Sequence, residues 1–287
     1  MGSTIIKKAV VPAAGLGTRL RPITRLLPKE LLPIGSRPLL DYVVEELRMA
    51  GIEEALFIVS AQKPQIAAYL GDSVGDKSDS IPTLRCYYAI QEEAKGSGHA
   101  LLYAEKWVGD DPFVVAFGDC ILESDPPGAP LRRLIDTHCS EGADAAILVE
   151  QVSREDVSRY GVAAPLYPLE RSPIFPFPLR DIVEKPGPDK APSLMVVAAR
   201  WTLSPSIFGA LRRSLPDSRG EWNIPDALRL LIEDGASAWA APLLAGEARR
   251  DIGSFSGYLE QFVRSALSDP LLGERARKAA RELLEKG

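Results

Sequence analysis

Short apolar runs alternate with stretches of helical spacing along most of the chain. Runs from Ile5 to Ala13, Ala55 to Ser60 and Phe113 to Phe117 show little polar alternation, which is typical of strands buried on both faces of a parallel sheet. Helical spacing predicts helices at Pro38 to Gly51, Pro64 to Leu70, Ala100 to Val108, Leu131 to Ser140, Pro205 to Arg213 and Asn223 to Glu233. We therefore expect an α/β fold with a mostly parallel sheet and helices on both of its faces.

The regular alternation loosens after a predicted strand from Ala145 to Val152. Gly161 and a proline-rich segment from Pro165 to Pro178 follow, and we interpret this region as an inserted hairpin. Later strands are predicted at Leu179 to Glu184, Leu194 to Thr202 and Ser237 to Leu243, and later helices at Tyr258 to Leu267 and Leu271 to Lys286. We expect a main domain over residues 1–268 and a C-terminal helical tail over residues 269–287.

The composition is that of a globular chain with a sizeable core. The 287 residues are 46% hydrophobic and 25% charged, which excludes the disordered and fibrous classes. The 34 basic and 39 acidic residues give a net charge of -5, which argues against a general nucleic-acid binder. An anionic ligand must therefore meet positive charge that is gathered locally.

Cysteine usage and hydropathy indicate a cytoplasmic protein that binds no membrane. The cysteines Cys86, Cys120 and Cys139 are odd in number and far apart, so they indicate neither a disulfide framework nor a zinc site. The N-terminal residues lack the apolar core of a signal peptide, and no stretch approaches the roughly 18 consecutive apolar residues of a membrane span.

A glycine-containing loop with nearby positive charge follows the first apolar run. In Ala13-Ala14-Gly15-Leu16-Gly17-Thr18 the two glycines allow close backbone approach, and the N–H groups are free to face an anion. Arg19, Arg21 and Lys29 supply the charge. The loop predicts phosphate binding, although two glycines after a strand also suit an ordinary tight turn.

The loop matches neither of the two common nucleotide fingerprints. It lacks the Gly-Lys-Ser/Thr of a P-loop, and Leu20 stands where a dinucleotide motif has its third glycine. A second glycine turn, Gly96-Ser97-Gly98, and the carboxylate of Asp119 also follow predicted strands. Ligands of parallel sheets bind beyond the carboxyl ends of the strands, so we expect these features to meet in one site.

These motifs, in this order, resemble those of bacterial sugar-1-phosphate nucleotidylyltransferases, and most closely those of UTP:glucose-1-phosphate uridylyltransferases. The resemblance runs from Lys8 to about Leu267. It rests on Gly15-Leu16-Gly17-Thr18-Arg19, Pro28-Lys29-Glu30-Leu31-Leu32-Pro33, Gln91 with Glu93 to Ala100, Asp119, Tyr160-Gly161-Val162, Val183-Glu184-Lys185-Pro186 and Asp251-Ile252-Gly253. It implies a Rossmann-like nucleotide-diphospho-sugar transferase fold and a homo-oligomer, with the last helix as the expected contact.

The resemblance also implies a reaction. An oxygen of a sugar-1-phosphate attacks the α-phosphorus of a nucleoside triphosphate and expels pyrophosphate, with Mg²⁺ required. Arg19 and Lys29 would hold the triphosphate and stabilise the developing charge. Backbone groups of the first loop would cradle the phosphates, at Ala13, Ala14, Gly15, Gly17 and Thr18.

Two carboxylates are implied as metal ligands. Asp119 and Asp251 would bind Mg²⁺, a hard cation that prefers oxygen ligands and keeps several waters. Their simpler interpretations are a cap at the end of a strand for Asp119 and a turn residue before Gly253 for Asp251.

Base and sugar contacts are implied further along the chain. Gln91 and Gly96 would face the base, because an amide pairs with both edges of uracil, an arrangement that thymine shares. The sugar phosphate would be bound by Gly161, Glu184, Lys185 and Val197. An exposed Glu184-Lys185 pair is the alternative there, and His99 is interpreted as packing at a helix start rather than as a general base.

Two departures from the family pattern leave the sugar open. The family expects Asn where this chain has Leu194 and Gly where it has Ala199, on a predicted strand that resembles the wall of the sugar pocket. The family also carries a longer insertion where this chain has Asp72 to Ser80.

We expect an Mg²⁺-dependent nucleotidylyltransferase that uses UTP and glucose-1-phosphate as small-molecule substrates. Two alternatives stay open from the residues alone. The same chemistry with dTTP or another triphosphate, and with another sugar or a cyclitol phosphate, keeps the site but changes a substrate. A non-catalytic module that binds nucleotide sugars keeps the fold but not the reaction.

Overall fold

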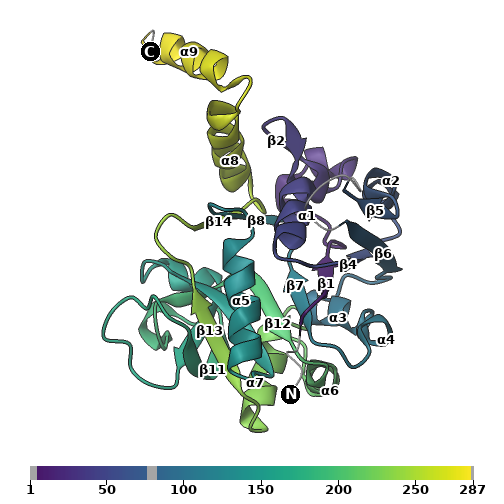
Figure 1. Ribbon diagram of the computed structural model, residues 1–287, viewed down its shortest axis with the longest axis vertical. Coiled ribbons are helices and arrows are strands. Elements are labelled where there is room, and N and C mark those ends of the chain that lie inside the picture. Colours follow the sequence, from purple (N-terminus) through teal and green to yellow (C-terminus); the bar gives the residue numbers. More distant parts are fainter. Residues whose placement is uncertain (1–4, 76–82, 286–287) are drawn as a thin grey trace.

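One large sheet runs through the molecule (Figure 1). The computed structural model describes residues 5–75 and 83–285, so the segment from Asp72 to Ser80, where the family carries its longer insertion, lies partly outside the described residues. In spatial order the strands are β10 (Gly161–Pro165), β11 (Phe177–Glu184), β13 (Ala238–Pro242), β9 (Ala145–Gln151), β12 (Met195–Leu203), β7 (Phe113–Ala116), β1 (Lys8–Pro12), β4 (Glu54–Val59), β6 (Leu84–Ile90) and β5 (Ser73–Val74).

Most of these strands run in one direction. β1 is parallel to β4 and β7, and β4 is parallel to β6. Three of the ten strands, β5, β11 and β12, run opposite to the rest, with β12 inserted between β7 and β9. The expectation of a mostly parallel sheet is confirmed, and the antiparallel strands mark where the chain leaves strict strand–helix alternation.

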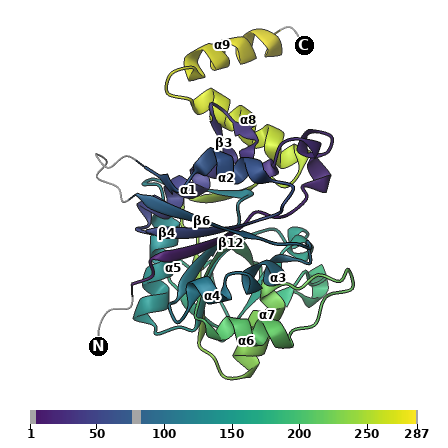
Figure 2. The same cartoon turned by 90° about the vertical axis from the view of Figure 1, so that its right-hand side faces the viewer.

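Helices cover both faces of the sheet (Figure 2). One apolar cluster joins the sheet to α1 (Leu39–Met49), α2 (Pro64–Leu70) and α5 (Ala129–Ser140). The other joins it to α3 (Ser97–Leu102), α4 (Glu105–Val108), α6 (Ser206–Arg213) and α7 (Ile224–Glu233). In α1 the buried side chains of Leu40, Val43, Val44 and Leu47 recur at helical spacing, which is why this segment folds against the sheet.

The predicted elements are found within a few residues of their expected bounds, with two kinds of difference: one helix is divided, and short strands occur that were not predicted. The prediction of a single helix from Ala100 to Val108 is wrong, because α3 and α4 are separate helices. Between them the backbone forms i→i+3 hydrogen bonds: the N–H of Ala104 donates to the carbonyl of Leu101, and the carbonyl of Ala104 accepts from the N–H of Trp107. The hairpin is confirmed, because β10 and β11 pair antiparallel.

The second difference is a small sheet that periodicity did not predict. β8 (Cys120–Glu123) follows the Gly118-Asp119 turn and pairs antiparallel with β14 (Ala248–Asp251). Another short pair, β2 (Pro33–Ile34) with β3 (Arg37–Pro38), closes the loop before α1. The pairing of β8 with β14 brings a late segment of the chain to the end of β7.

The last two helices form an arm that extends away from the sheet (Figure 1). α8 (Phe255–Ser268) buries only Tyr258 and Gln261, and α9 (Gly273–Leu284) buries only Gly273. Within the described part of the chain, no helix combines the length and the apolar character that crossing a lipid bilayer requires.

Candidate active site

The loop after β1 is built from short 3₁₀ turns: η1 (Thr18–Leu20), η2 (Ile23–Arg25) and η3 (Lys29–Leu31). Gly17 has a φ of +61°, which a glycine adopts without strain. Its carbonyl accepts a hydrogen bond of 2.7 Å from the hydroxyl of Thr24, so the loop is held in shape by its own side chains. Ala13 and Ala14 are buried at its base, whereas Gly15 and Thr18 are exposed at its outer side.

Lys29 lies over this loop. Its Nζ is 2.5 Å from Oδ2 of Asp119, and a Cβ added to Gly15 would lie 3.4 Å from the same nitrogen. Burial disfavours the charge on Lys29, but the carboxylates of Asp119 and Glu30 outweigh burial and raise the pKa of Lys29. The ammonium therefore stays charged beside the backbone of the glycine loop.

Asp119 and Asp251 meet through the small sheet. Asp251 pairs with Cys120, and the N–H of Ile252 donates to the carbonyl of Asp119 at 3.1 Å. Burial opposes ionisation of Asp119, but the cation of Lys29 overcomes it and lowers the pKa of the carboxyl. Asp119 and Asp251 therefore lie close together where β8 pairs with β14 at the end of β7.

Arg19 completes the charged centre. Oδ1 of Asp251 accepts from the N–H of Gly253 at 2.8 Å, and a Cβ on Gly253 would lie 3.1 Å from Nη2 of Arg19. The guanidinium of Arg19 therefore lies beside Gly253 and Asp251, with its side chain exposed. Two cations and two carboxylates surround the end of β1, an arrangement that suits a polyphosphate with a divalent cation.

The proposed base contacts lie at the end of β6, two strands away from β1 in the sheet. Gln91 follows β6 and is buried, and its Nε2 is 2.9 Å from Nδ1 of His99. Gly96 has a φ of +96°, and an added Cβ would collide with the carbonyl of Trp222. The rings of His99 and Trp222 are 6.2 Å apart. His99 thus packs at the start of α3, as expected, and it also orients the amide of Gln91.

The proposed sugar contacts lie at β10, β11 and β12, on the opposite side of β7 from β1. A Cβ on Gly161 would lie 3.2 Å from Oε2 of Glu184 and 3.4 Å from Cγ2 of Val197, with Pro225 next to them. The exposed Lys185 bonds to Oε1 of Glu184 at 2.6 Å. The structure therefore brings Gly161, Glu184 and Val197 together, and Lys185 lies at their rim.

The two departures from the family pattern have different places. Leu194 lies directly before β12, within one residue of its expected place, and its side chain packs against an apolar cluster of Val157, Val162 and Val196. Val197, the proposed sugar contact on β12, belongs to a different apolar cluster from the one that Leu194 packs against. Ala199 lies in β12 with a φ of +57°, a conformation that suits the glycine of the family pattern.

Buried ion pairs behind the site were missed by sequence reasoning. Glu30 is bonded to Lys63, and Arg200 is bonded to Glu46 at 2.6 and 2.8 Å. Arg200 also donates to the carbonyl of Cys120 at 2.9 Å, next to Asp119. Charged residues are seldom fully buried, and no local pattern distinguishes these from surface charges.

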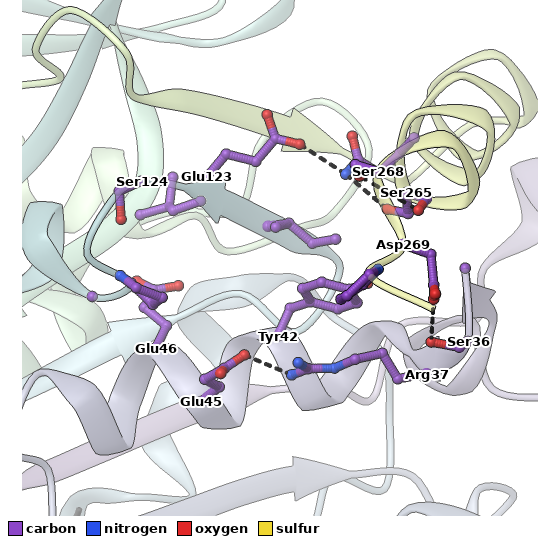
Figure 3. A pocket seen from close by; sticks show the side chains of 17 residues that line it. Ser36, Arg37, Tyr42, Glu45, Glu46, Glu123, Ser124, Ser265, Ser268 and Asp269 are labelled. Carbon is purple, nitrogen blue, oxygen red and sulfur yellow. Dashed lines mark hydrogen bonds and ion pairs between the residues drawn. The ribbon is translucent and has the colours of Figure 1, made fainter. Parts of the chain in front are cut away.

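A separate cavity lies between α1, β8 and α8 (Figure 3). Arg37, paired with Glu45, and Glu123, paired with Gln261, line it, and Asp269 bonds to Ser36 across its edge. None of the predicted site residues lines this cavity. Gln261 joins α8 to β8 at this cavity, and Tyr258 also packs α8 against the body of the protein.

The carboxylates of the site suit a divalent cation that is bound together with substrate phosphates. Among residues 5–75 and 83–285, no group of three or more His, Cys, Asp or Glu side chains is arranged to hold a metal ion by itself. Mg²⁺ does not need such a cage, because it commonly takes one or two carboxylates together with waters and substrate phosphates. Asp119 and Asp251 fit that requirement.

A glycine loop with two cations, two carboxylates and a second glycine turn at the carboxyl ends of β1, β7 and β6 defines a nucleotide-binding phosphoryl-transfer protein. A family profile described as Nucleotidyl transferase matches residues 8–266. The chain belongs to this nucleotidyl transferase family.

The similar proteins carry more specific names. The UTP–glucose-1-phosphate uridylyltransferase 2 of Staphylococcus saprophyticus is 34% identical over 280 residues, covering 92% of this chain and 93% of the relative. The UTP-bound UGPase from Acinetobacter baumannii is 29% identical with a TM-score of 0.85, over 97% of this chain and 100% of that one. A UDP-glucose pyrophosphorylase complexed with UDP-glucose is 32% identical with a TM-score of 0.79, over 90% and 97%.

Proposed function

We propose that this protein is an enzyme that transfers a uridylyl group from UTP to glucose-1-phosphate, forming UDP-glucose and pyrophosphate. The observation that carries the proposal is the pairing of Lys29 with Asp119 at 2.5 Å directly over Gly15. Relatives and structural neighbours that match nearly the whole chain are named for this reaction or bind its nucleotides.

The residues divide the chemistry between binding and charge stabilisation. A phosphate oxygen of glucose-1-phosphate is already an anion, so no general base is required for it to attack the α-phosphorus. Lys29 and Arg19 lower the repulsion between the two anionic substrates and stabilise the charge on the leaving pyrophosphate. The backbone N–H groups of the loop at residues 13–18 hold the phosphates in line.

Mg²⁺ is the proposed cofactor, held by Asp119 and Asp251. When bound, it neutralises phosphate charge and orients the triphosphate. Lys29 already occupies Oδ2 of Asp119, which keeps that carboxylate ionised and in place beside the loop.

The base is proposed to lie against Gln91 and Gly96. Nε2 of Gln91 faces Nδ1 of His99, so its Oε1 is left to accept from N3–H of uracil and its second N–H to donate to a carbonyl of the base. Cytosine, which has no N3–H, does not match this arrangement.

Glucose-1-phosphate is proposed to lie between Gly161 and Val197. Glu184 accepts from sugar hydroxyls and Lys185 meets the phosphate. Because Leu194 packs in an apolar cluster with Val162, its replacement of the family's Asn does not argue for a different sugar.

A cytoplasmic location and a homo-oligomer complete the proposal. The described cysteines are all free thiols, which suits a reducing compartment. The arm formed by α8 and α9, which includes much of the proposed tail over residues 269–287, is the proposed contact between copies.

The test is a substrate matrix with pyrophosphate release as the readout. UTP, dTTP, CTP, ATP and GTP are each combined with glucose-1-phosphate, other hexose-1-phosphates and a cyclitol phosphate. We expect the highest kcat/KM for UTP with glucose-1-phosphate. Activity confined to dTTP or to another acceptor would refute the substrate assignment, and UTP binding without turnover of any acceptor would favour the non-catalytic module.

A further inference from the structure

A buried lysine lies directly beneath the phosphate loop. Lys63, at the start of α2, is only 8% exposed, and its Nζ donates to the carbonyl of Ala13 at 3.0 Å and to that of Gly15 at 2.6 Å. It also donates to both carboxylate oxygens of Glu30, at 2.9 and 3.2 Å. One ammonium thus binds the loop at two carbonyls and a carboxylate from another segment.

The two carbonyl contacts determine where the loop points its N–H groups. In a trans peptide the C=O and the N–H of the following residue point in opposite directions. When Lys63 binds the carbonyls of Ala13 and Gly15, the N–H groups of Ala14 and Leu16 are directed away from it. These N–H groups are then presented on the open side of the loop, where an anion is bound without competition from the loop's own carbonyls.

Glu30 connects this arrangement to the charged centre. Its side chain is fully buried, it follows Lys29 in η3, and a Cβ on Gly118 would lie 3.3 Å from its Cγ. Glu30 therefore lies between the loop, the turn that carries Lys29 and the residue before Asp119.

We propose that Lys63 and Glu30 are positioning residues that orient the N–H groups of the loop at residues 13–16 toward the triphosphate and hold Lys29 at the same site. The proposal rests on the proposed function of this loop in nucleotide binding. Neither residue touches a substrate, because both are buried behind the loop.

The charges of the pair support this role. Burial raises the pKa of Glu30, which Lys29 and Lys63 counteract, and burial lowers the pKa of Lys63, which Glu30 counteracts. Each group therefore depends on the other to remain charged. Without Lys63, Glu30 would have only Lys29 as a neighbouring cation and would compete with Asp119 for it.

The experiment separates positioning from simple neutralisation of buried charge. Lys63→Met, Glu30→Gln and the double variant Lys63→Met/Glu30→Gln are compared with wild type for kcat, for the KM of each substrate and for the free energy of unfolding. Arg133→Met is the matched control, because Arg133 also joins a carboxylate, Glu247, to a backbone carbonyl but lies away from the loop.

We expect Lys63→Met to raise the KM for UTP about tenfold or more while changing the KM for glucose-1-phosphate less than about twofold. The double variant removes the unpaired buried carboxylate, so it should recover stability but not UTP affinity. Arg133→Met should lower stability and leave both KM values unchanged.

Recovery of the wild-type KM for UTP in the double variant would overturn the proposal, as would an equal rise in both KM values. Calorimetric titration with UTP in the absence of an acceptor gives the same comparison from binding alone. Loss of UTP affinity in Lys63→Met therefore tests the positioning role even if the wild-type protein fails to form UDP-glucose. If Lys63→Met does not fold, the double variant decides the outcome, because it has no unpaired buried charge.

Discussion

At the scale of single residues, the proposed sugar end of the site depends on a missing side chain. Gly161 is buried, and a Cβ there would lie 3.2 Å from Oε2 of Glu184 and 3.4 Å from Cγ2 of Val197. Oε2 is the far end of a flexible side chain, so Gly161→Ala is compatible with folding but displaces Glu184 and narrows the space beside the ring.

We expect Gly161→Ala to raise the KM for glucose-1-phosphate about tenfold and to change the KM for UTP less than about twofold. Steady-state kinetics with each substrate varied in turn measures both. Gly209→Ala is the control: it lies in α6 with nothing within 4 Å of the added Cβ, and it should leave both constants unchanged. A rise in the KM for UTP alone would place Gly161 elsewhere in the site.

We expect His99 to make recognition of the base by Gln91 dependent on pH. Burial, and then the cation of Lys95, lower the pKa of His99 below its ordinary value of 6.5 against the opposing effect of Glu93. The neutral imidazole accepts from Gln91, and the imidazolium cannot, because both of its nitrogens carry protons. Protonation therefore turns the amide of Gln91 away from the arrangement that matches uracil.

We compare the KM for UTP of the Gln91→Ala variant with that of wild type, as a ratio of variant to wild type. We expect this ratio to stay constant from pH 8 to about 6.5 and to shrink only at lower pH, because protonation of His99 then raises the wild-type KM. The ratio is used because the phosphates of UTP titrate equally in both proteins. If the ratio already falls between pH 8 and 6.5, the lowered pKa of His99 is not what controls Gln91.

At the scale of elements, the pairing of β8 with β14 assembles the carboxylates. These strands are separated by more than a hundred residues, yet their pairing sets Asp251 opposite Cys120, next to Asp119. The contact of Arg200 with the carbonyl of Cys120 fixes β8 from behind. The proposed metal site is thus a product of tertiary pairing rather than of any one segment.

We expect Asp251→Asn to raise the Mg²⁺ concentration for half-maximal activity about tenfold, because an amide oxygen carries no charge. Removal of divalent cations with EDTA should abolish pyrophosphate release, and added Mg²⁺ should restore it. Asp234→Asn, an exposed carboxylate at the end of α7, is the control with no change expected. An unchanged Mg²⁺ requirement in Asp251→Asn would remove this residue from the metal site.

Elements with a strong hydrophobic periodicity could be predicted from the sequence, but the pairing of the strands could not. The apolar run of β1 and the helical spacing of α1 indicated their types and nearly their bounds. The four-residue strands β8 and β14 carry too few residues for a pattern, and the antiparallel direction of β12 depends on the path of its connections.

The same distinction applies to the site. Lys29 and Asp119 were predicted because they lie in motifs, whereas Lys63 and Arg200 were missed because only the folded environment shows that they are buried. The face to which the side chain of Leu194 turns could not be predicted, because a departure from a motif does not reveal it.

At the scale of the whole molecule, the C-terminal arm presents apolar surface to solvent. On α8 the side chains of Phe255, Leu259 and Val263 recur every four residues and are exposed, at 37%, 56% and 53%. The opposite side of α8 is fastened to the body by Gln261 and Asp269 (Figure 3). An anchored helix with an exposed apolar stripe suits packing against a second copy of the chain.

We expect the wild-type protein to have at least twice the mass of one chain by light scattering, and Leu259→Glu/Val263→Glu to have the mass of one chain. Charges buried in an apolar contact are strongly unfavourable, whereas the same charges on a free surface are not. Leu215→Glu, at an exposed site away from the arm, should keep the wild-type mass. A wild-type mass equal to one chain would contradict the proposed contact.

We propose that the pairing of Lys29 with Asp119 over Gly15 serves uridylyl transfer. The most direct measurement uses ³¹P NMR to follow the reaction of UTP with glucose-1-phosphate in the presence of Mg²⁺ and the purified protein. The Lys29→Met variant is measured under the same conditions. We predict UDP-glucose and pyrophosphate in equal amounts for wild type, and a loss of kcat of about a hundredfold or more for Lys29→Met. Release of inorganic phosphate without a nucleotide sugar, or full activity in Lys29→Met, would contradict the account.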